Sequence, residues 1–168
     1  EAAAVEGKVV VAGSSSVTPV MEKLAEGYKT VNDKVEIEVQ QSDSTTGITS
    51  AAEGICDIGM ASRELKDEET KENLTATKIA RDGIAVVVDP ANTVEDISKA
   101  DLAKIYTGEI KNWSELGGED QPIVVIGRES GSGTRDAFEE LVEVEEKCVY
   151  SNELDSTGAV VAKVAATK

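Results

Sequence analysis

Short β-branched runs alternate with helix-like segments along the chain, and this alternation is the feature that most restricts the fold. Residues 8–12 (KVVVA) form the first run and residues 35–41 (VEIEVQQ) the second, with a segment of helical spacing at residues 18–30 between them. Strands separated by helices of this length are typical of a parallel sheet covered by helices. The sequence therefore predicts an α/β protein.

The same alternation continues through the rest of the sequence. Further strands are expected at residues 55–60, 78–89 and 122–127. A second helix is expected from the end of the SDSTTG loop to about residue 53, and further helices at residues 66–73, 99–106, 134–142 and 157–166. The first helix has Val20, Leu24 and Tyr28 on one face, and a later helix turns Phe138 and Leu141 inward. These apolar faces are the expected contacts between the helices and the sheet.

Composition restricts the chemistry of the protein. The 168 residues have a net charge of −16 and include no histidine, with 40% hydrophobic and only 3% aromatic residues. The core therefore has to be built from Val, Ile, Leu and Ala. The negative charge argues against nucleic acid and against anionic membrane surfaces as partners. The lack of histidine excludes the usual Ser-His-Asp triad.

Several conspicuous residues are interpreted as structural. Cys56 lies in an apolar run and is expected to be buried and unpaired. Trp113 is expected to be a packing anchor, and the acidic run at residues 139–146 a solvated helix face. No metal-binding spacing occurs. No stretch is apolar enough to cross a bilayer or to form a signal peptide, so an exported protein would have its targeting segment outside this sequence.

Three strand-to-helix loops are rich in small hydroxyl residues. They lie at residues 13–19 (GSSSVTP), 42–47 (SDSTTG) and 125–136 (VIGRESGSGTRD). The first N–H groups of a helix lack internal partners and carry partial positive charge, so an oxyanion fits there. Ligands of open α/β sheets bind at the carboxyl ends of strands. Helix capping by Ser and Thr explains any one loop, but three such loops together favour an anion site.

Arginines accompany these loops. Arg128 lies at the strand end of the third loop and Arg63 follows the strand expected at residues 55–60, so both could face one crevice. Arg135 is unusual because a cation in the first turn of a helix opposes the helix dipole. Pairing with Glu139 one turn later is favoured over a ligand contact for Arg135.

Sequence motifs of several enzyme classes are missing. The string GxxxxGK[ST] of nucleotide hydrolases does not occur, and GxGxxG does not occur in its required setting. No SxxK pattern occurs in the three loops. Binding without catalysis and without a cofactor is therefore predicted.

Several longer motifs occur in a fixed order along the chain. They are GSSSVTP, STTGI followed by DIGMASREL, IARDGIAVVVDP, LAKIYTGEIKNWSELGG and GRESGSGTRDAFEE. On these motifs, the sequence resembles the phosphate-binding proteins of ABC-type high-affinity phosphate transporters from residue 8 to residue 168. The resemblance implies a two-lobed, periplasmic-binding-protein-like fold of type II, with inorganic phosphate held in the cleft between the lobes.

The resemblance also implies which residues contact phosphate. They are Ser15, Ser16, Ser44, Arg63, Arg128, Ser132, Gly133 and Thr134. Many family members have an aspartate at the position of Arg63, where it accepts the proton of the phosphate. With an arginine there, Asp43 and Asp57 are the candidate proton acceptors, although a structural role for Asp57 is an equal alternative.

The same resemblance implies the organisation and the partners of the protein. Residues 1–80 would form the first lobe and residues 81–168 part of the second, with a first crossing near residues 79–81. Independently of the resemblance, Asp82-Gly83 interrupts the run at residues 78–89 and indicates a tight turn or a crossover kink there. The C-terminal return segment would be missing, or present as a separate chain. The closed, phosphate-bound form would be recognised by a membrane permease outside the cytoplasm, in a periplasm or at the cell surface as a lipoprotein. A phosphate sensor or adhesion protein and an enzyme acting on phosphoesters are the alternatives.

Overall fold

The structure is a computed structural model that describes residues 5–167. The chain divides into two compact units. The first contains the chain up to Arg81 together with the turn Gly131–Gly133, and the second contains Asp82–Ser130 and the chain from Thr134 onwards. Among residues 5–167, no helix has the length and apolar character needed to cross a membrane.

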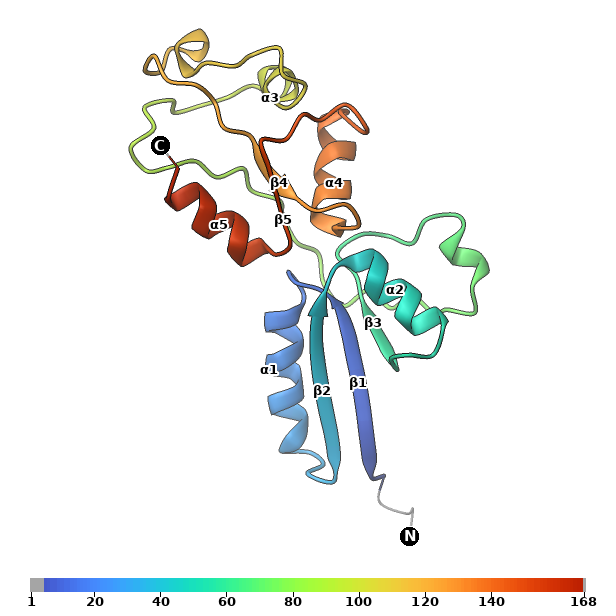
Figure 1. Cartoon of the computed structure of the whole chain (residues 1–168). Helices are drawn as coiled ribbons and strands as arrows, with labels where there is room; N and C mark the ends of the chain where they lie inside the picture. Colours follow the sequence, from blue (N-terminus) through green and yellow to red (C-terminus); the bar gives the residue numbers. More distant parts are fainter. Residues whose placement is uncertain (1–4, 168) are drawn as a thin grey trace. The chain divides into compact units, whose positions relative to one another are not determined.

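The first unit is a parallel sheet with helices packed against it (Figure 1). Its strands are β1 (Gly7–Ser14), β2 (Val35–Ser42) and β3 (Ile58–Met60), and its helices are α1 (Thr18–Lys29), α2 (Ser44–Ala52) and the short 3-10 helix η1 (Glu69–Lys71). The strand order is β2-β1-β3, with both pairings parallel. Helix α1 packs against β2, and α2 packs against β1 and β3. The predicted parallel α/β architecture is confirmed.

The core of the first unit lies between the sheet and α2. Val11, Ile48 and Met60 are at most 5% exposed. Cys56 is also buried and makes no disulfide, as predicted, and burial raises the pKa of its thiol. Helix α2 can pack this closely because Gly47 faces the sheet. A Cβ atom at Gly47 would lie 2.7 Å from the Cα of Gly13 and 2.8 Å from the carbonyl oxygen of Met60.

Helix α1 has the predicted bounds but leaves its apolar face uncovered. Val20, Leu24 and Tyr28 are 40–53% exposed. The helix buries Thr18 and Ala25 instead. Its spacing correctly predicts a helix, but no element among the described residues covers the face that Val20, Leu24 and Tyr28 form.

The second unit contains a small parallel strand pair, β4 and β5, flanked by α4 and α5 (Figure 1). Its elements are α3 (Lys99–Tyr106), the 3-10 helix η2 (Trp113–Leu116), β4 (Ile126–Arg128), α4 (Gly133–Val142), β5 (Asn152–Leu154) and α5 (Thr157–Ala165). The predicted helices at residues 99–106, 134–142 and 157–166 are confirmed to within one residue. Strand β5 was not predicted, because a three-residue strand has too little sequence pattern to detect.

Several strand and helix predictions were too long. The strand expected at residues 55–60 begins only at Ile58, and the one expected at residues 122–127 is β4, which begins at Ile126. The helix expected at residues 66–73 is reduced to η1. The end of a short strand or helix depends on the neighbouring strand or surface against which it packs. A short amphipathic sequence pattern gives no information about that neighbour.

The run at residues 78–89 is not a strand in this structure. It is drawn out without regular structure, and no backbone hydrogen bond from Ile84–Val88 occurs to any described residue. Val86, Val87 and Val88 are 40–46% exposed. A β-branched run becomes a strand only when a neighbouring strand supplies the ladder hydrogen bonds.

Two further expectations concerned α4. Leu141 does not point inward, because it is 63% exposed, whereas Phe138 is half-buried with its ring 4.6 Å from that of Tyr106. The acidic run at residues 139–146 is not uniformly solvated, because Glu139 is only 9% exposed. Its carboxylate is retained in the interior by an ion pair with Arg135.

Two glycine substitutions test the close packing of α2. Gly47→Ala should lower the free energy of unfolding of the first unit by about 1–3 kcal/mol, because the new methyl group meets backbone atoms that cannot move aside. Gly27→Ala is the matched control, since a Cβ atom at Gly27 in α1 meets nothing within 4 Å. It should raise stability by up to about 1 kcal/mol, from helix propensity. Urea unfolding followed by circular dichroism measures both, and equal effects would contradict the packing argument.

Candidate functional site

The parallel register gathers the carboxyl ends of three strands at one edge of the first unit. Ser14 at the end of β1 pairs with Ser42 of β2, and Gly13 pairs with Met60 at the end of β3. The chain that follows each strand therefore leaves the sheet at the same edge. The first two loops that the sequence singles out, and Ser62 after β3, lie there.

Four serine hydroxyl groups form a hydrogen-bonded cluster at this edge. The Ser14 hydroxyl donates to Ser62 Oγ at 3.0 Å and lies 2.9 Å from Ser16 Oγ. Ser44 Oγ lies 3.3 Å from Ser62 Oγ and accepts the backbone N–H of Ser62 at 3.1 Å. Ser44 is fully buried and Ser14 is 3% exposed. The cluster joins all three strand ends through groups that can donate hydrogen bonds to an oxyanion.

Ser14 and Ser62 were not among the predicted site residues. The signal for them was present, since each lies two residues after a predicted strand, at residues 8–12 for Ser14 and 55–60 for Ser62. Ser15, which was predicted, is 7% exposed beside the cluster, and the predicted Ser16 and Ser44 are members of it.

The turn Gly131–Gly133 of the third loop belongs to the first unit. The carbonyl oxygen of Gly131 accepts both the backbone N–H and the hydroxyl of Thr45, each at 3.2 Å. A Cβ atom at Gly133 would collide with Ser44 Oγ and would lie 2.8 Å from Ser62 Oγ. The predicted residues Ser132 and Gly133 therefore lie against the serine cluster, and Ser132 is only 1% exposed.

Helix capping does not account for these serines. The N-cap of α1 is Val17, which makes no side-chain capping bond. The N-cap of α2 is Asp43, whose carboxylate accepts the backbone N–H of Thr46 at 2.9 Å and its hydroxyl at 2.6 Å. Because other residues hold the capping positions, the capping explanation fails for the first two loops and an anion site is the better explanation.

Arg63 is engaged by a carboxylate. Its two terminal nitrogens each donate to Glu69 at 2.7 Å, and one also donates to Thr45 Oγ1 at 3.1 Å. The side chains of Arg63 and Glu69 are 6% and 14% exposed. The hydrogen bonds from Arg63 hold the pKa of Glu69 below its usual range, against the opposing effect of burial. Arg63 thus orients Thr45, which in turn holds Gly131.

The two candidate proton acceptors have different surroundings. Burial raises the pKa of Asp43, but the hydrogen bonds from Thr46 outweigh burial and hold that pKa below its usual range. Asp57 accepts the backbone N–H of Val10 at 2.8 Å, which is a structural contact within the sheet. Asp43 is closer to the site, because a Cβ atom at Gly131 would lie 2.8 Å from its carboxylate oxygen.

Arg128 ends β4 in the second unit and is 6% exposed. Its Nε and one terminal nitrogen donate to the two carboxylate oxygens of Glu129 at 2.8 Å, and its other terminal nitrogen donates to Thr157 Oγ1 at 3.1 Å. A guanidinium group has five N–H donors. Two of them, one on each terminal nitrogen, have no partner among the described residues, so the planar guanidinium fork still has donors to offer to an oxyanion.

Arg135 pairs with Glu139 as predicted, with Nε 2.8 Å from the carboxylate. Thr134 lies beside Arg128 and Arg135 in the lining of a cavity of about 100 Å³ in the second unit. The structure thus places Arg128 and Thr134 together in this unit, and the other predicted site residues in the first.

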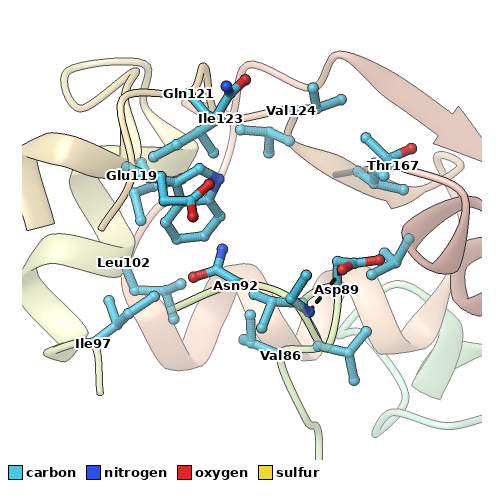
Figure 2. Close-up of a pocket in the computed structure, with 18 of the residues that line it drawn as sticks. Val86, Asp89, Asn92, Ile97, Leu102, Glu119, Gln121, Ile123, Val124 and Thr167 are labelled. Atoms are coloured by element: carbon cyan, nitrogen blue, oxygen red, sulfur yellow. Dashed lines mark hydrogen bonds between the residues drawn. The ribbon is translucent and has the colours of Figure 1, made fainter. Parts of the chain in front are cut away.

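A larger cavity of about 330 Å³ lies elsewhere in the second unit (Figure 2). Its lining is mainly apolar, with Val86, Ile123 and Val124 around the half-buried Trp113. None of the predicted phosphate-binding residues lines it. This cavity is therefore not the candidate anion site.

The comparisons with known proteins agree with this geometry. Residues 1–167 match the family described as PBP superfamily domain. The chain belongs to this family. It is 44% identical to a Clostridium perfringens phosphate ABC transporter substrate-binding protein whose crystal structure contains bound phosphate, with a TM-score of 0.90 over 96% of this chain and 67% of that one. A phosphate transport receptor from Vibrio cholerae is 34% identical, with a TM-score of 0.73 over 95% of this chain and 67% of that one.

Two further relatives are also named as phosphate-binding proteins. A phosphate-binding protein of Streptococcus agalactiae (PstS 2) is 60% identical over 110 residues, which are 66% of this chain and 38% of that protein. A phosphate-binding protein of Bacillus subtilis (PstS) is 40% identical over 134 residues, 79% of this chain and 45% of that protein. The chain therefore spans less than half the length of these two relatives. The resemblance to phosphate-binding proteins and the periplasmic-binding-protein-like fold are confirmed.

The Arg63–Glu69 pair gives a pH-dependent prediction. Glu69→Gln should lower the free energy of unfolding at pH 7 by about 1–3 kcal/mol, because Arg63 then loses its counter-charge while mostly buried. Since folding lowers the pKa of Glu69, the pair contributes fully above the unfolded-state value of about 4.3 and less as pH falls through the folded-state value. The difference from the parent protein should shrink below about pH 4.

The control for this prediction is Glu64→Gln. Glu64 pairs with Lys78, but its side chain is 82% exposed, so its loss should change stability little at any pH. Chemical denaturation between pH 3 and pH 8 measures both variants. A Glu69→Gln effect that stays constant across this range would contradict the assignment.

Proposed function

We propose that this protein captures inorganic phosphate and delivers it to the membrane permease of an ABC transporter, without catalysing a reaction. The observation that supports this most directly is the cluster of Ser14, Ser16, Ser44 and Ser62 at the strand ends of the first unit. None of these hydroxyl groups caps a helix, and they lie against the glycine turn of the third loop. The C. perfringens relative, with its bound phosphate, has the same fold.

The net charge of −16 does not prevent the binding of an anion. At physiological salt the Debye length is about 8 Å, so distant surface carboxylates contribute little. Hydroxyl and backbone donors near the N-termini of α1 and α2 act at contact distance, where each charge-assisted hydrogen bond contributes about 1.5–3 kcal/mol. Arg128 would supply positive charge through its two remaining N–H donors. Ser132, Gly133 and Thr134 would supply further hydrogen-bond donors. Arg63 could contact phosphate only by giving up one of its present hydrogen bonds to Glu64, Glu69 or Thr45.

We further propose that a polypeptide segment absent from this chain covers Ile84–Val88. The segment would correspond to the third of the C. perfringens structure that this chain does not match. Val86, Val87 and Val88 are apolar on both faces of an extended run and have no ladder partner among the described residues, which is typical of an interior strand. In this proposal the protein acts outside the cytoplasm, in a periplasm or anchored at the cell surface.

Calorimetric titration tests phosphate capture. The protein should bind phosphate, and Ser44→Ala and Arg128→Lys should each weaken binding at least tenfold, because one removes a buried hydroxyl and the other the planar fork. Thr49→Ala on the exposed side of α2 and Lys147→Ala are the matched controls and should bind as the parent does. Sulfate and a phosphomonoester are titrated in parallel, since turnover of the ester would indicate an enzyme. Absence of binding, both to this chain and to the chain supplemented with the missing segment, would contradict the proposal.

Hydrogen exchange tests the proposed covering segment. The amides of Ile84–Val88 should exchange rapidly in this chain and become at least tenfold slower when a polypeptide with the unmatched C. perfringens sequence is added. Val87→Lys should abolish this protection, because it places a charge on an interior strand. Val31→Lys, at a residue that is 79% exposed in the first unit, should not. Unchanged exchange with a correctly folded added segment would contradict the proposal that this segment covers Ile84–Val88.

A further inference from the structure

Arg135 occupies an electrostatically unfavourable position. It lies in the first turn of α4, where the partial positive charge of the helix N-terminus repels a cation. An arginine on the other side of Glu139, one turn nearer the C-terminus of the helix, could form the same i,i+4 ion pair without opposing the dipole. The remaining contacts of the guanidinium group explain why it lies here.

The Arg135 guanidinium group joins α4 to both strands of the second unit. One terminal nitrogen donates to the backbone carbonyl oxygen of Arg128 at 2.9 Å and to the carboxylate of Glu153 in β5 at 2.8 Å. Its Nε donates to Glu139 at 2.8 Å within α4. The side chain is 20% exposed. The contact with Arg128 is made to the main chain, so it holds the end of β4 rather than the Arg128 side chain.

Tyr150 completes the arrangement around the same strand end. The Arg135 guanidinium carbon lies 4.5 Å from the centre of the Tyr150 ring, and the Tyr150 hydroxyl donates to Glu139 at 2.8 Å. A Cβ atom at Gly127 would collide with the ring, so the ring lies directly on the backbone that precedes Arg128. Tyr106 also packs against the Tyr150 ring, edge to face, with 5.8 Å between the ring centroids.

Strand β4 needs such support because its own pairing is short. It has three residues, and within residues 5–167 its one ladder neighbour is β5. The direction of the two free Arg128 donors depends on where the main chain of Arg128 lies. A shift of about 1 Å in that main chain would misdirect a bidentate contact.

We infer that Arg135 is a positioning residue for anion binding, which fixes the end of β4 and so aims the Arg128 fork. The expected effect of Arg135 on phosphate affinity rests on the proposed function. Its expected effect on the orientation of the Arg128 side chain does not. Arg135 contacts Glu139, Glu153, Tyr150 and the Arg128 carbonyl in the second unit, and the inference assigns it no contact with the ligand.

Two measurements test this inference, and only one depends on phosphate. The first follows the Nε–H signal of Arg128 by NMR in the ligand-free protein, assigned through its loss in Arg128→Lys. Arg135→Gln should broaden or shift this signal, because Arg128 then samples several orientations. Lys163→Gln, which removes an exposed cation of α5, should leave it unchanged. The second titrates phosphate, for which Arg135→Gln should lose at least tenfold in affinity.

Conservative variants separate positioning from general stability. Arg135→Lys keeps a cation over the Tyr150 ring and one donor for the Arg128 carbonyl, so it should recover part of the affinity and of the Arg128 signal. Tyr150→Phe keeps the ring but removes its bond to Glu139 and should lose less than threefold. If Arg135→Gln does not fold, these two variants test the inference in its place.

Each outcome decides the inference. A changed Arg128 signal with weakened binding in Arg135→Gln, and partial recovery of both in Arg135→Lys, supports it. An unchanged Arg128 signal overturns it, whatever the affinity, and so does a changed signal with unchanged affinity. If the parent protein binds no phosphate, the proposed function fails, and the Arg128 signal alone then decides whether Arg135 positions the fork.

Discussion

The close approach of α2 to the sheet is the constraint on which the rest of the first unit depends. Gly47 allows the helix backbone to lie against Gly13 and Met60, where any side chain would meet main-chain atoms. This approach buries Ser44 at the first turn of α2 and places its hydroxyl beside Ser62. The glycine turn Gly131–Gly133 then fits against those hydroxyl groups. The chemistry of the site thus follows from a packing distance that only glycine permits.

Charge in this protein is organised at short range. Arg63 is held by Glu69, Arg128 by Glu129, and Arg135 by Glu139 and Glu153. Each of these three arginines is therefore oriented by a neighbouring carboxylate rather than by the field of the whole molecule. The large negative charge of the chain keeps the surface solvated, while local donors determine what binds. Arg63 and Arg128 differ in the number of N–H donors that remain for a ligand. The terminal nitrogens of Arg63 already donate to Glu64, Thr45 and Glu69. Each terminal nitrogen of Arg128 keeps one donor without a partner among the described residues.

The fold was predictable wherever it depends on local pattern. Helices α1, α3 and α4 have the bounds that residue spacing predicts, because a helix satisfies its own backbone hydrogen bonds within the segment. The strands were less predictable, because a strand exists only where a neighbour completes its ladder. For this reason β3 is shorter than its apolar run, and β5 was missed. Residues 78–89 have a strong strand pattern and form no strand.

The sequence alone determined that three hydroxyl-rich loops follow strands and that histidine chemistry is excluded, and it favoured pairing of Arg135 with Glu139 over a ligand contact. These conclusions depend on residue type and on spacing of a few positions, which the chain order preserves. Only the tertiary structure decided which hydroxyl groups meet: Ser14 and Ser62 lie 48 residues apart, and Thr45 and Gly131 lie 86 apart. It also decided that Arg63 binds Glu69 and that Arg135 holds the main chain of Arg128. Contacts between distant segments follow from strand register and from the depth to which a helix can pack, and neither property is written in any short stretch of sequence.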